Sequence, residues 1–359
     1  MPGSLGTKLV RGVFRSWFGR SRAATEVDIV YTWVDGNDAE FQRTCRNYAL
    51  ASQPHAAVAE QRFRDSDELR FSLRSLESYV PWAGRVFLVT NGQVPRWLRR
   101  DHPRVRLVRH EEIFPDPSHL PTFNSAAIEA HLHRIPGISR YFLYLNDDFF
   151  FGRRISPRHY LTGDGRPRLW VDRWQLPFRY SSRDDLALQW FAYSRKLLTD
   201  ALGRRRFASP AHGPILVDRD AFAEVVSQWS EEFARTSAFR FRVGRMAMPH
   251  VLYLHWLAAR RGGELAVNSG KQYAFAMFQP PLSSVEAHFH SIRRSRPLCF
   301  CINDDWDGDA EVKDSRLRQF LESYFPQPSS FEVSEPDRRE QAPLRARPGL
   351  DQRPNVAIS

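Results

Sequence analysis

The chain has 359 residues, 42% of them hydrophobic and 13% aromatic, and 52 lysines and arginines exceed 41 acidic residues to give a net charge of +11. This composition allows a sizeable folded core and excludes a chain that is disordered throughout. The charge favours anionic partners such as nucleic acid, membrane lipid or phosphorylated substrates, although most single arginines are expected on the solvated surface.

The first 25 residues are basic, and no apolar run in the chain reaches the roughly 18 residues that spanning a bilayer requires. Arg11 and Arg15 interrupt the apolar part of this segment, which is unlike a secretory signal. If residues 8–20 are helical, one face is apolar and borders arginines: Val10, Val13, Phe14 and Trp17. The pattern predicts either a membrane-surface helix or a loosely ordered basic tail.

Short runs of β-branched and aromatic residues predict strands, and helical spacing of apolar residues between them predicts helices. The predicted strands are residues 27–34, 85–90, 105–108, 141–145, 215–217 and 297–302. The predicted helices are residues 67–79, 126–133, 220–229, 248–261 and 313–324, with Ser125 capping the second and Asp220 the third. This alternation predicts an α/β fold with a mostly parallel sheet flanked by helices. Residues 333–359 are polar and Pro-rich, which predicts a disordered tail.

Two predicted strands end in the same triplet, Asn146-Asp147-Asp148 (the first triplet) and Asn303-Asp304-Asp305 (the second triplet). Adjacent carboxylates at the end of a core strand are costly to bury unless a cation, a phosphate-binding site or a proton transfer uses them. In open α/β sheets, ligands bind at the carboxyl ends of strands. The triplets therefore predict one Mg²⁺ or Mn²⁺ ion held by Asp148, Asn303 and Asp304. Two unrelated Asn-Asp turns are the alternative.

The three cysteines are Cys45, Cys299 and Cys301. Their number and spacing predict neither a disulfide framework nor a zinc site. Cys299 and Cys301 would share one face of a strand, so we expect them in the core of a protein from a reducing compartment.

Four blocks of the sequence resemble those of a known protein family. The first is residues 28–38, and the second is residues 62–75, continued by 89–92, 120–124 and 144–148. The third is residues 210–214 with Arg242, and the fourth is residues 301–305 with the helix to 326. In this order they are similar to the Stealth family, which includes bacterial capsular-polysaccharide phosphotransferases. They also resemble the catalytic core of the animal N-acetylglucosamine-1-phosphotransferase alpha/beta subunit. The blocks cover most of residues 27–332.

The resemblance implies a nucleotide-sugar-transferase-like fold and makes residues 26–332 a sugar-phosphate transferase domain. Such an enzyme moves a sugar-1-phosphate from a nucleoside diphosphate sugar to a glycan hydroxyl, forms a phosphodiester and releases nucleoside monophosphate. We expect it in capsule or exopolysaccharide synthesis, in the cytoplasm at the inner face of the membrane. A conventional glycosyltransferase releasing nucleoside diphosphate is the alternative. Nucleic-acid binding is disfavoured because the arginines are dispersed along the chain.

The resemblance also implies catalytic residues. Asp147 and Asp148 match the acidic pair of the family, and one accepts the acceptor proton while the other anchors the cation, in an order left open. His212 is expected as base or acid, with a surface histidine as the alternative. Arg242 is expected on the transferring phosphate. Residues 243–250 lack the acids that the animal enzyme carries there, so that part of the site cannot be carried over.

Nine further residues are predicted to contact substrate: Asp28, Tyr31, Trp33, Arg70, Arg74, Asn91, Gly92, Asn124 and Asn146. The two arginines lie a turn apart on one helix and could reach an anion, or could form a solvated face with Glu77. The Asn-Gly pair suits close approach of backbone to a ligand, or an ordinary turn. The aromatic residues either flank the nucleotide or pack in the core.

Overall fold

The computed structural model describes residues 26–49, 57, 60–179, 181, 185–203 and 205–333. The predicted surface helix at residues 8–20 lies outside this range, as does the predicted tail beyond Val333. Within the described range, no helix combines the length and apolar character needed to cross a bilayer.

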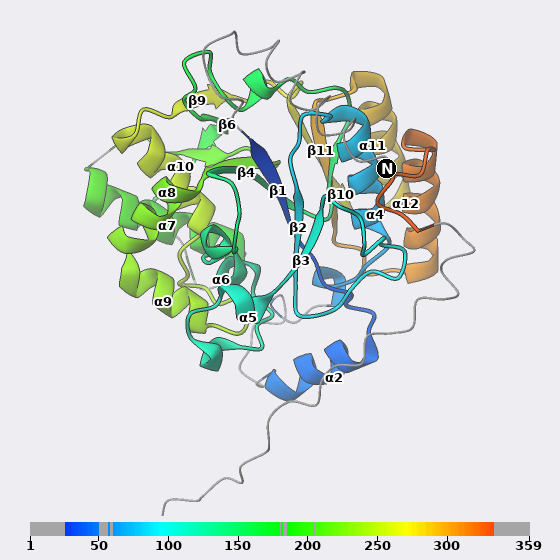
Figure 1. The fold of residues 1–359 in the computed structure, drawn as a ribbon, viewed down its shortest axis with the longest axis horizontal. Helices are drawn as coiled ribbons and strands as arrows, with labels where there is room; N and C mark the ends of the chain where they lie inside the picture. The colour runs from blue at the N-terminus through cyan, green and yellow to red at the C-terminus, as the bar shows by residue number, and fades with distance from the viewer. Residues whose placement is uncertain are drawn as a thin grey trace, which may run out of the picture.

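A five-stranded sheet forms the centre of the molecule, in the order β3-β2-β1-β4-β8 (Figure 1). Its strands are β1 (Val27–Thr32), β2 (Val86–Thr90), β3 (Val105–Arg109), β4 (Tyr141–Asn146) and β8 (Ile215–Asp218). The first four run parallel and β8 is antiparallel to β4, so the predicted mostly parallel α/β sheet is confirmed. Thr32 lies opposite Asn146, which places the carboxyl ends of β1 and β4 at one level.

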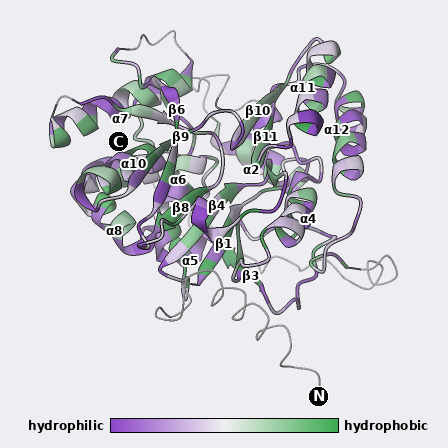
Figure 2. Ribbon diagram, turned by 90° about the horizontal axis from the view of Figure 1, so that it is seen from above, coloured by the Kyte–Doolittle hydropathy of each residue, from purple (hydrophilic) through white to green (hydrophobic). Residues whose placement is uncertain are grey.

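Alternate side chains of the central strands enter different layers, as expected for a sheet buried on both faces. On one face, Ile29 and Leu143 pack against Leu73 of α4 (Glu68–Tyr79). On the other, Val30 and Phe142 pack against α8 (Arg219–Gln228) and α10 (Pro249–Arg260). Hydrophobic residues gather on the strands and on the helix faces that meet them (Figure 2).

The remaining helices surround the sheets (Figure 1): α2 (Ala39–Tyr48), α5 (His110–Ile113), α6 (Ser125–Glu129), α7 (Leu186–Leu202), α8 (Arg219–Gln228), α9 (Ser230–Ala238), α10 (Pro249–Arg260), α11 (Leu282–Ser295) and α12 (Ala310–Tyr324). Two three-stranded sheets complete the fold. One is β10 (Tyr273–Phe278), β11 (Cys299–Asp304) and β5 (Phe149–Phe151). The other is β7 (Ala208–Pro210), β6 (Arg168–Gln175) and β9 (Glu264–Val267).

Three predicted boundaries are corrected. The cap of α6 is Asn124 rather than Ser125, because the Asn124 side-chain oxygen accepts from the Ala126 N–H at 3.2 Å. The cap of α8 is Asp218, which accepts from the Asp220 N–H at 3.1 Å. Strand β11 does not end before the second triplet, because it continues through Asp304.

Candidate active site

The structure brings the two triplets together. Strand β5 leaves the first triplet and pairs antiparallel with β11, with Phe149 opposite Cys301. The Asp148 carbonyl accepts a hydrogen bond from the Ile302 N–H at 3.3 Å. Because β4 ends at Asn146, both triplets lie at the carboxyl end of the central sheet. The convergence expected from the sequence is confirmed, although the function of each acid is a separate question.

The first triplet presents two acids whose charge is poorly compensated. Burial raises the pKa of Asp148 to about 7, against a hydrogen bond from Cys301 that lowers it. Burial and then the charge of Asp148 raise the pKa of Asp147 well above its ordinary value, and Glu68 and Asp65 add to the effect. Both acids keep part of their surface accessible although protein surrounds them.

Cys301 contacts the acid pair, which corrects the expectation that it only packs in the core. Its Sγ lies 3.1 Å from Asp148 Oδ2. Asp148 Oδ1 is buried and has no hydrogen-bond partner among the described residues. Cys299, on the same strand, is buried and contacts the Tyr160 hydroxyl at 3.7 Å, so core packing describes it well. One carboxylate oxygen of Asp148 is therefore held by a thiol and the other is left unpaired.

His212 lies between two aromatic rings, one of which belongs to the residue that follows the acid pair. Its ring centroid is 5.1 Å from that of Phe149, which follows Asp148 directly, and 4.8 Å from that of Phe275. Burial, followed by the charge of His250, lowers the pKa of His212. The imidazole is therefore neutral at pH 7 and can accept a proton. Phe275 was not anticipated from the sequence.

Arg242 approaches the same region from the segment before α10. Its Nη2 donates to Ser125 Oγ at 2.8 Å, and its guanidinium lies 5.7 Å from the Trp190 ring centroid. No acidic side chain of the described residues lies within ion-pair distance of it. Burial and the charge of Arg62 lower the pKa of Arg242 to about 10, which still leaves it charged. A half-buried guanidinium without a carboxylate is suited to an anionic ligand.

Tyr144 connects Arg242 with the first triplet. The Tyr144 hydroxyl donates to Asn146 Oδ1 at 2.8 Å and to Glu129 Oε1 at 3.4 Å. The charge of Glu129 raises the pKa of Arg242. His250 Nδ1 lies 2.9 Å from Glu129 Oε2. The sequence departure at residues 243–250 therefore still places a titratable side chain near the site.

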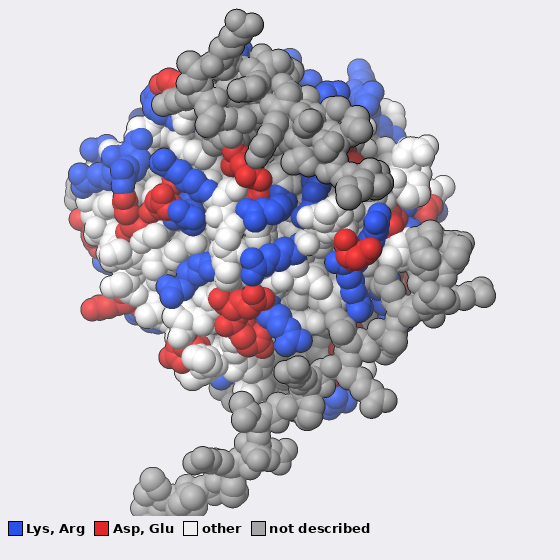
Figure 3. All heavy atoms as spheres, viewed as in Figure 1, with Lys and Arg blue, Asp and Glu red and all other residues white. Residues whose placement is uncertain are grey.

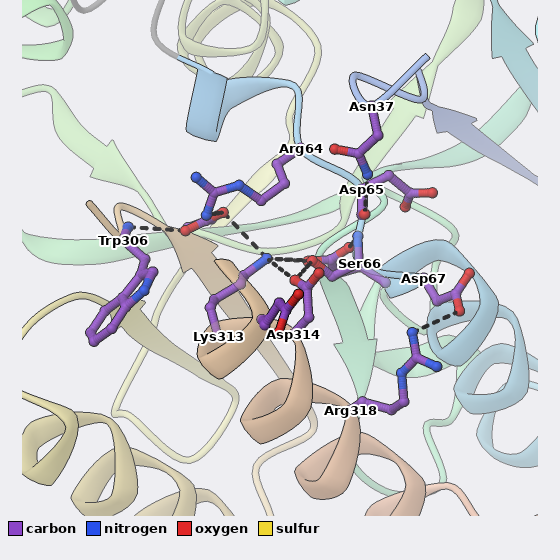
Figure 4. Close-up of polar contacts among 12 residues, drawn as sticks. Asn37, Arg64, Asp65, Ser66, Asp67, Trp306, Lys313, Asp314 and Arg318 are labelled. Atoms are coloured by element: carbon purple, nitrogen blue, oxygen red, sulfur yellow. Dashed lines mark hydrogen bonds and ion pairs between the residues drawn. The ribbon is translucent and has the colours of Figure 1, made fainter. Parts of the chain in front are cut away.

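The second triplet differs in its surroundings. Asp304 Oδ2 lies 3.2 Å from Arg64 Nη1 and 3.2 Å from Lys313 Nζ. Its Oδ1 accepts from the Trp306 N–H at 3.0 Å (Figure 4). Among the described residues, no three carboxylate, imidazole or thiol side chains are arranged to hold a metal ion. The predicted set of Asp148, Asn303 and Asp304 contains only two such side chains, so it stays a prediction, but Asp304 is already paired with two cations.

The segment before α4 contributes ionisable residues that were not predicted from the sequence. Burial, then the charges of Glu68 and Asp67, raise the pKa of Asp65 to about 8, and Asp65 in turn raises the pKa of Asp147. Arg62 lies close enough to lower the pKa of Arg242. Asp65 and Arg62 both lie in the block at residues 62–75, but nothing in the sequence was a reason to assign them, rather than Arg70 and Arg74, to the site.

Two predicted substrate contacts lie elsewhere. Asp28 stands at the start of β1, at the amino edge of the sheet, where its Oδ2 accepts from Ser139 N and Arg85 Nη2, both at 2.9 Å. The Asn124 side chain is occupied by its cap and by a hydrogen bond to the Phe239 carbonyl at 3.0 Å. These contacts explain both residues structurally.

The two helix arginines also have a structural partner. Arg70 Nε and Arg74 Nε bind the Glu332 carboxylate at 2.5 and 2.7 Å, so they hold the end of the described chain against α4. The partner is Glu332 rather than Glu77, so the alternative of a solvated face with Glu77 is wrong. The Tyr31 hydroxyl lies 2.8 Å from Ser72 Oγ in the core.

Four of the predicted contacts remain near the carboxyl edge: Trp33, Asn91, Gly92 and Asn146. The Gln93 side chain accepts from the Asp35 N–H at 2.9 Å and joins the loops after β1 and β2. Gly92 has a φ of 103°, in the left-handed region that favours glycine. On the face shown in Figure 3, basic and acidic side chains are interspersed.

Family models match this chain in four places. They are the conserved regions of Stealth proteins: region 1 at residues 25–52, region 2 at 62–169, region 3 at 211–259 and region 4 at 290–343. Together they cover most of the described chain and include both triplets, His212 and Arg242.

Curated relatives agree with these matches. The chain is 40% identical over 314 residues to an exopolysaccharide phosphotransferase of Streptomyces coelicolor, covering 86% of this chain and 53% of the relative. It is 32% identical over 320 residues to one of Mycobacterium tuberculosis, covering 86% and 58%. The chain thus spans about half the length of these relatives. A galactosyltransferase crystallised with donor and acceptor sugar analogues aligns over 88% of this chain and 100% of its own, at 15% identity. Its TM-score of 0.41 is too low to support an inference.

Proposed function

The chain belongs to the Stealth family, and we propose that it transfers a sugar-1-phosphate from a nucleoside diphosphate sugar to a glycan hydroxyl. The product is a phosphodiester and the leaving group is nucleoside monophosphate. The relatives named exopolysaccharide phosphotransferases support this reaction class and a place in polysaccharide synthesis.

The observation that carries the proposal is the poorly compensated acid pair, in a fold that also packs a neutral imidazole against Phe149 and holds Arg242 with no ion-paired carboxylate among the described residues. Phosphoryl transfer depends mainly on positioning and on neutralising charge. Arg242 supplies a fixed positive charge for the transferring phosphate. His212, neutral at pH 7, accepts the proton of the acceptor hydroxyl. The Tyr144 hydroxyl and Asn146 orient the end of β4 between them.

The first triplet also suits a divalent cation better than the second. Asp148 has an unpaired buried oxygen, and Asp147 lies beside it. Mg²⁺ in enzymes is commonly bound by one or two carboxylates together with substrate phosphates. Asp147 and Asp148, with the Asn303 amide oxygen, would hold such an ion, and when bound it would neutralise diphosphate charge. We leave Asp304, Asp28, Asn124, Arg70, Arg74 and Tyr31 out of the proposed site because their side chains have structural partners.

The test is to incubate the protein with a panel of nucleotide sugars, glycan acceptors and Mg²⁺ or Mn²⁺, and to identify the released nucleotide by chromatography. We expect nucleoside monophosphate from the wild type and none from Asp148→Ala. Asp200→Ala, which removes an exposed acid of α7, serves as the matched control. Release of nucleoside diphosphate would point to a conventional glycosyltransferase. Undiminished release from Asp148→Ala would reject the proposed site.

We further propose that residues 8–20 bring the enzyme to the inner face of the membrane, as the basic amphipathic pattern suggests. Flotation with anionic liposomes tests this. The full chain should float more than a chain without residues 1–25, and equal partitioning would contradict the idea.

A further inference from the structure

Lys313 occupies the centre of an acidic cluster behind the second triplet. Its side chain extends from α12 and is 1% exposed. Its Nζ lies 3.2 Å from Glu68 Oε1, 3.2 Å from Asp304 Oδ2 and 3.8 Å from Asp314 Oδ1. It also donates to Ser66 Oγ at 2.6 Å, and Figure 4 shows it pointing toward Ser66 and Asp314.

The buried ammonium of Lys313 can offset the charge of these carboxylates only while it stays protonated. Burial lowers the pKa of Lys313, but the charges of Glu68 and Asp304 outweigh that effect and the net shift is upward. Lys313 is therefore a cation at neutral pH. Its three donors match Ser66, Glu68 and Asp304, so none of its hydrogen-bonding capacity is lost.

The carboxylates around Lys313 come from different parts of the chain. Glu68 begins α4, Asp304 ends β11, and Asp314 lies in the first turns of α12. Carboxylates gathered from separate segments repel one another unless a positive charge stands between them. With Lys313 in place these carboxylates are not arranged to hold a metal ion, so a divalent cation would bind them only by drawing them around the space that the ammonium leaves.

We propose that Lys313 serves as a built-in cation of the second triplet and fastens the segment at residues 64–68 to β11 and α12. Asp304 then has no place for a metal ion, since two cations share its Oδ2 and the Trp306 N–H binds its Oδ1. The chain uses one triplet for structure and leaves the other for ligand. This assignment does not depend on the reaction that the enzyme performs.

The contacts of Lys313 with the segment at residues 64–68 also affect the acid pair. Asp67 has a φ of 66°, a left-handed conformation that is unfavourable for a non-glycine residue. Lys313 holds Ser66 and Glu68 on either side of it. The same segment carries Asp65, whose charge raises the pKa of Asp147. Lys313 is thus a positioning residue, and only this last effect rests on the proposed function.

Thermal unfolding of the full chain with and without Ca²⁺ tests the proposal. Lys313→Ala removes the ammonium and leaves carboxylates around an open space, so Ca²⁺ should bind there. We expect a lower Tm than the wild type in chelator and a Ca²⁺-induced rise in Tm about 3 °C or more above the wild-type rise. Lys196→Ala, which removes an exposed lysine of α7, should respond to Ca²⁺ as the wild type does.

Two further variants sharpen the result. Lys313→Met fills the space with an uncharged chain, and its Tm should fall with little recovery in Ca²⁺. Adding Glu68→Gln to Lys313→Ala should remove most of the Ca²⁺ response. An equal Ca²⁺ response in Lys313→Ala and wild type would overturn the proposal, as would a Lys313→Ala chain that stays unfolded with Ca²⁺ present. Neither measurement uses turnover, so failure of the proposed reaction would leave this test intact.

Discussion

The two Asn-Asp-Asp triplets are identical in sequence and lie next to each other, yet their surroundings are opposite. In the first, a thiol contacts one oxygen of Asp148, the other oxygen has no hydrogen-bond partner among the described residues, and burial raises the pKa of Asp148 to about 7. Asp304 of the second is bound by a lysine, an arginine and a backbone N–H. The motif alone does not decide whether an acid is structural or available for ligand. Its neighbours in space do.

The largest difference between variants of the two triplets is expected in kcat. Asp148→Asn is expected to lower kcat by about 10²–10⁴-fold, the range found when a positioned acid or base is lost. Asp304→Asn should lower it by about tenfold or less, because it acts only through the position of the segment at residues 64–68. Steady-state release of nucleoside monophosphate measures both. Equal losses would remove the distinction between the triplets.

Stability should change in opposite directions. Asp304→Asn leaves Lys313 and Arg64 with one fewer carboxylate and should lower the free energy of unfolding by about 1.5–3 kcal/mol. Asp148→Asn removes a poorly compensated charge and should raise it at pH 8, by roughly 1–3 kcal/mol.

The raised pKa of Asp148 determines how the stability difference between Asp148→Asn and wild type changes with pH. Because the folded-state pKa of Asp148 is raised, the native state binds more protons than the unfolded state between about pH 4 and 7. The contribution of this carboxyl to stability is therefore lost as pH rises through about 7. Urea unfolding of Asp148→Asn and wild type should differ most at pH 8, less at pH 5, and nearly coincide at about pH 4. A difference independent of pH would contradict the assignment.

The smallest expected effect concerns the thiol. Cys301→Val removes the donor to Asp148 and should lower kcat about fivefold, which corresponds to about 1 kcal/mol for one hydrogen bond. Cys301→Ser keeps a donor and should stay within about twofold of the wild type. Cys299→Val, in the same strand but away from Asp148, is the matched control. If Cys301→Ser and Cys301→Val lose the same activity, the hydrogen bond is irrelevant and only volume matters.

Much of the fold followed from local patterns. The apolar runs of β1, β2 and β4 and the leucine spacing of α4 are strong signals, because these elements are buried along their length. Strands β9 and β10 were missed because their burial alternates with exposure at sheet edges.

The site was predictable only in part. The acid pair could be predicted because two ionisable residues directly follow an apolar strand. Asp28 could have been excluded, since a residue that begins a parallel strand lies at the edge opposite the ligand side. Arg70 and Arg74 could not, because their partner Glu332 is distant in sequence. The role of Lys313 could not be predicted from the sequence, because it depends on three segments that meet only in the fold.

The most direct test of the contrast is a carboxyl NMR titration of protein labelled with ¹³C at the aspartate side chains, recorded from pH 4 to 9 without divalent cation. The resonance absent from Asp148→Asn should titrate near pH 7. If that resonance is already fully ionised at pH 5, Asp148 is as well compensated as an ordinary surface acid and the proposed difference between the triplets is wrong.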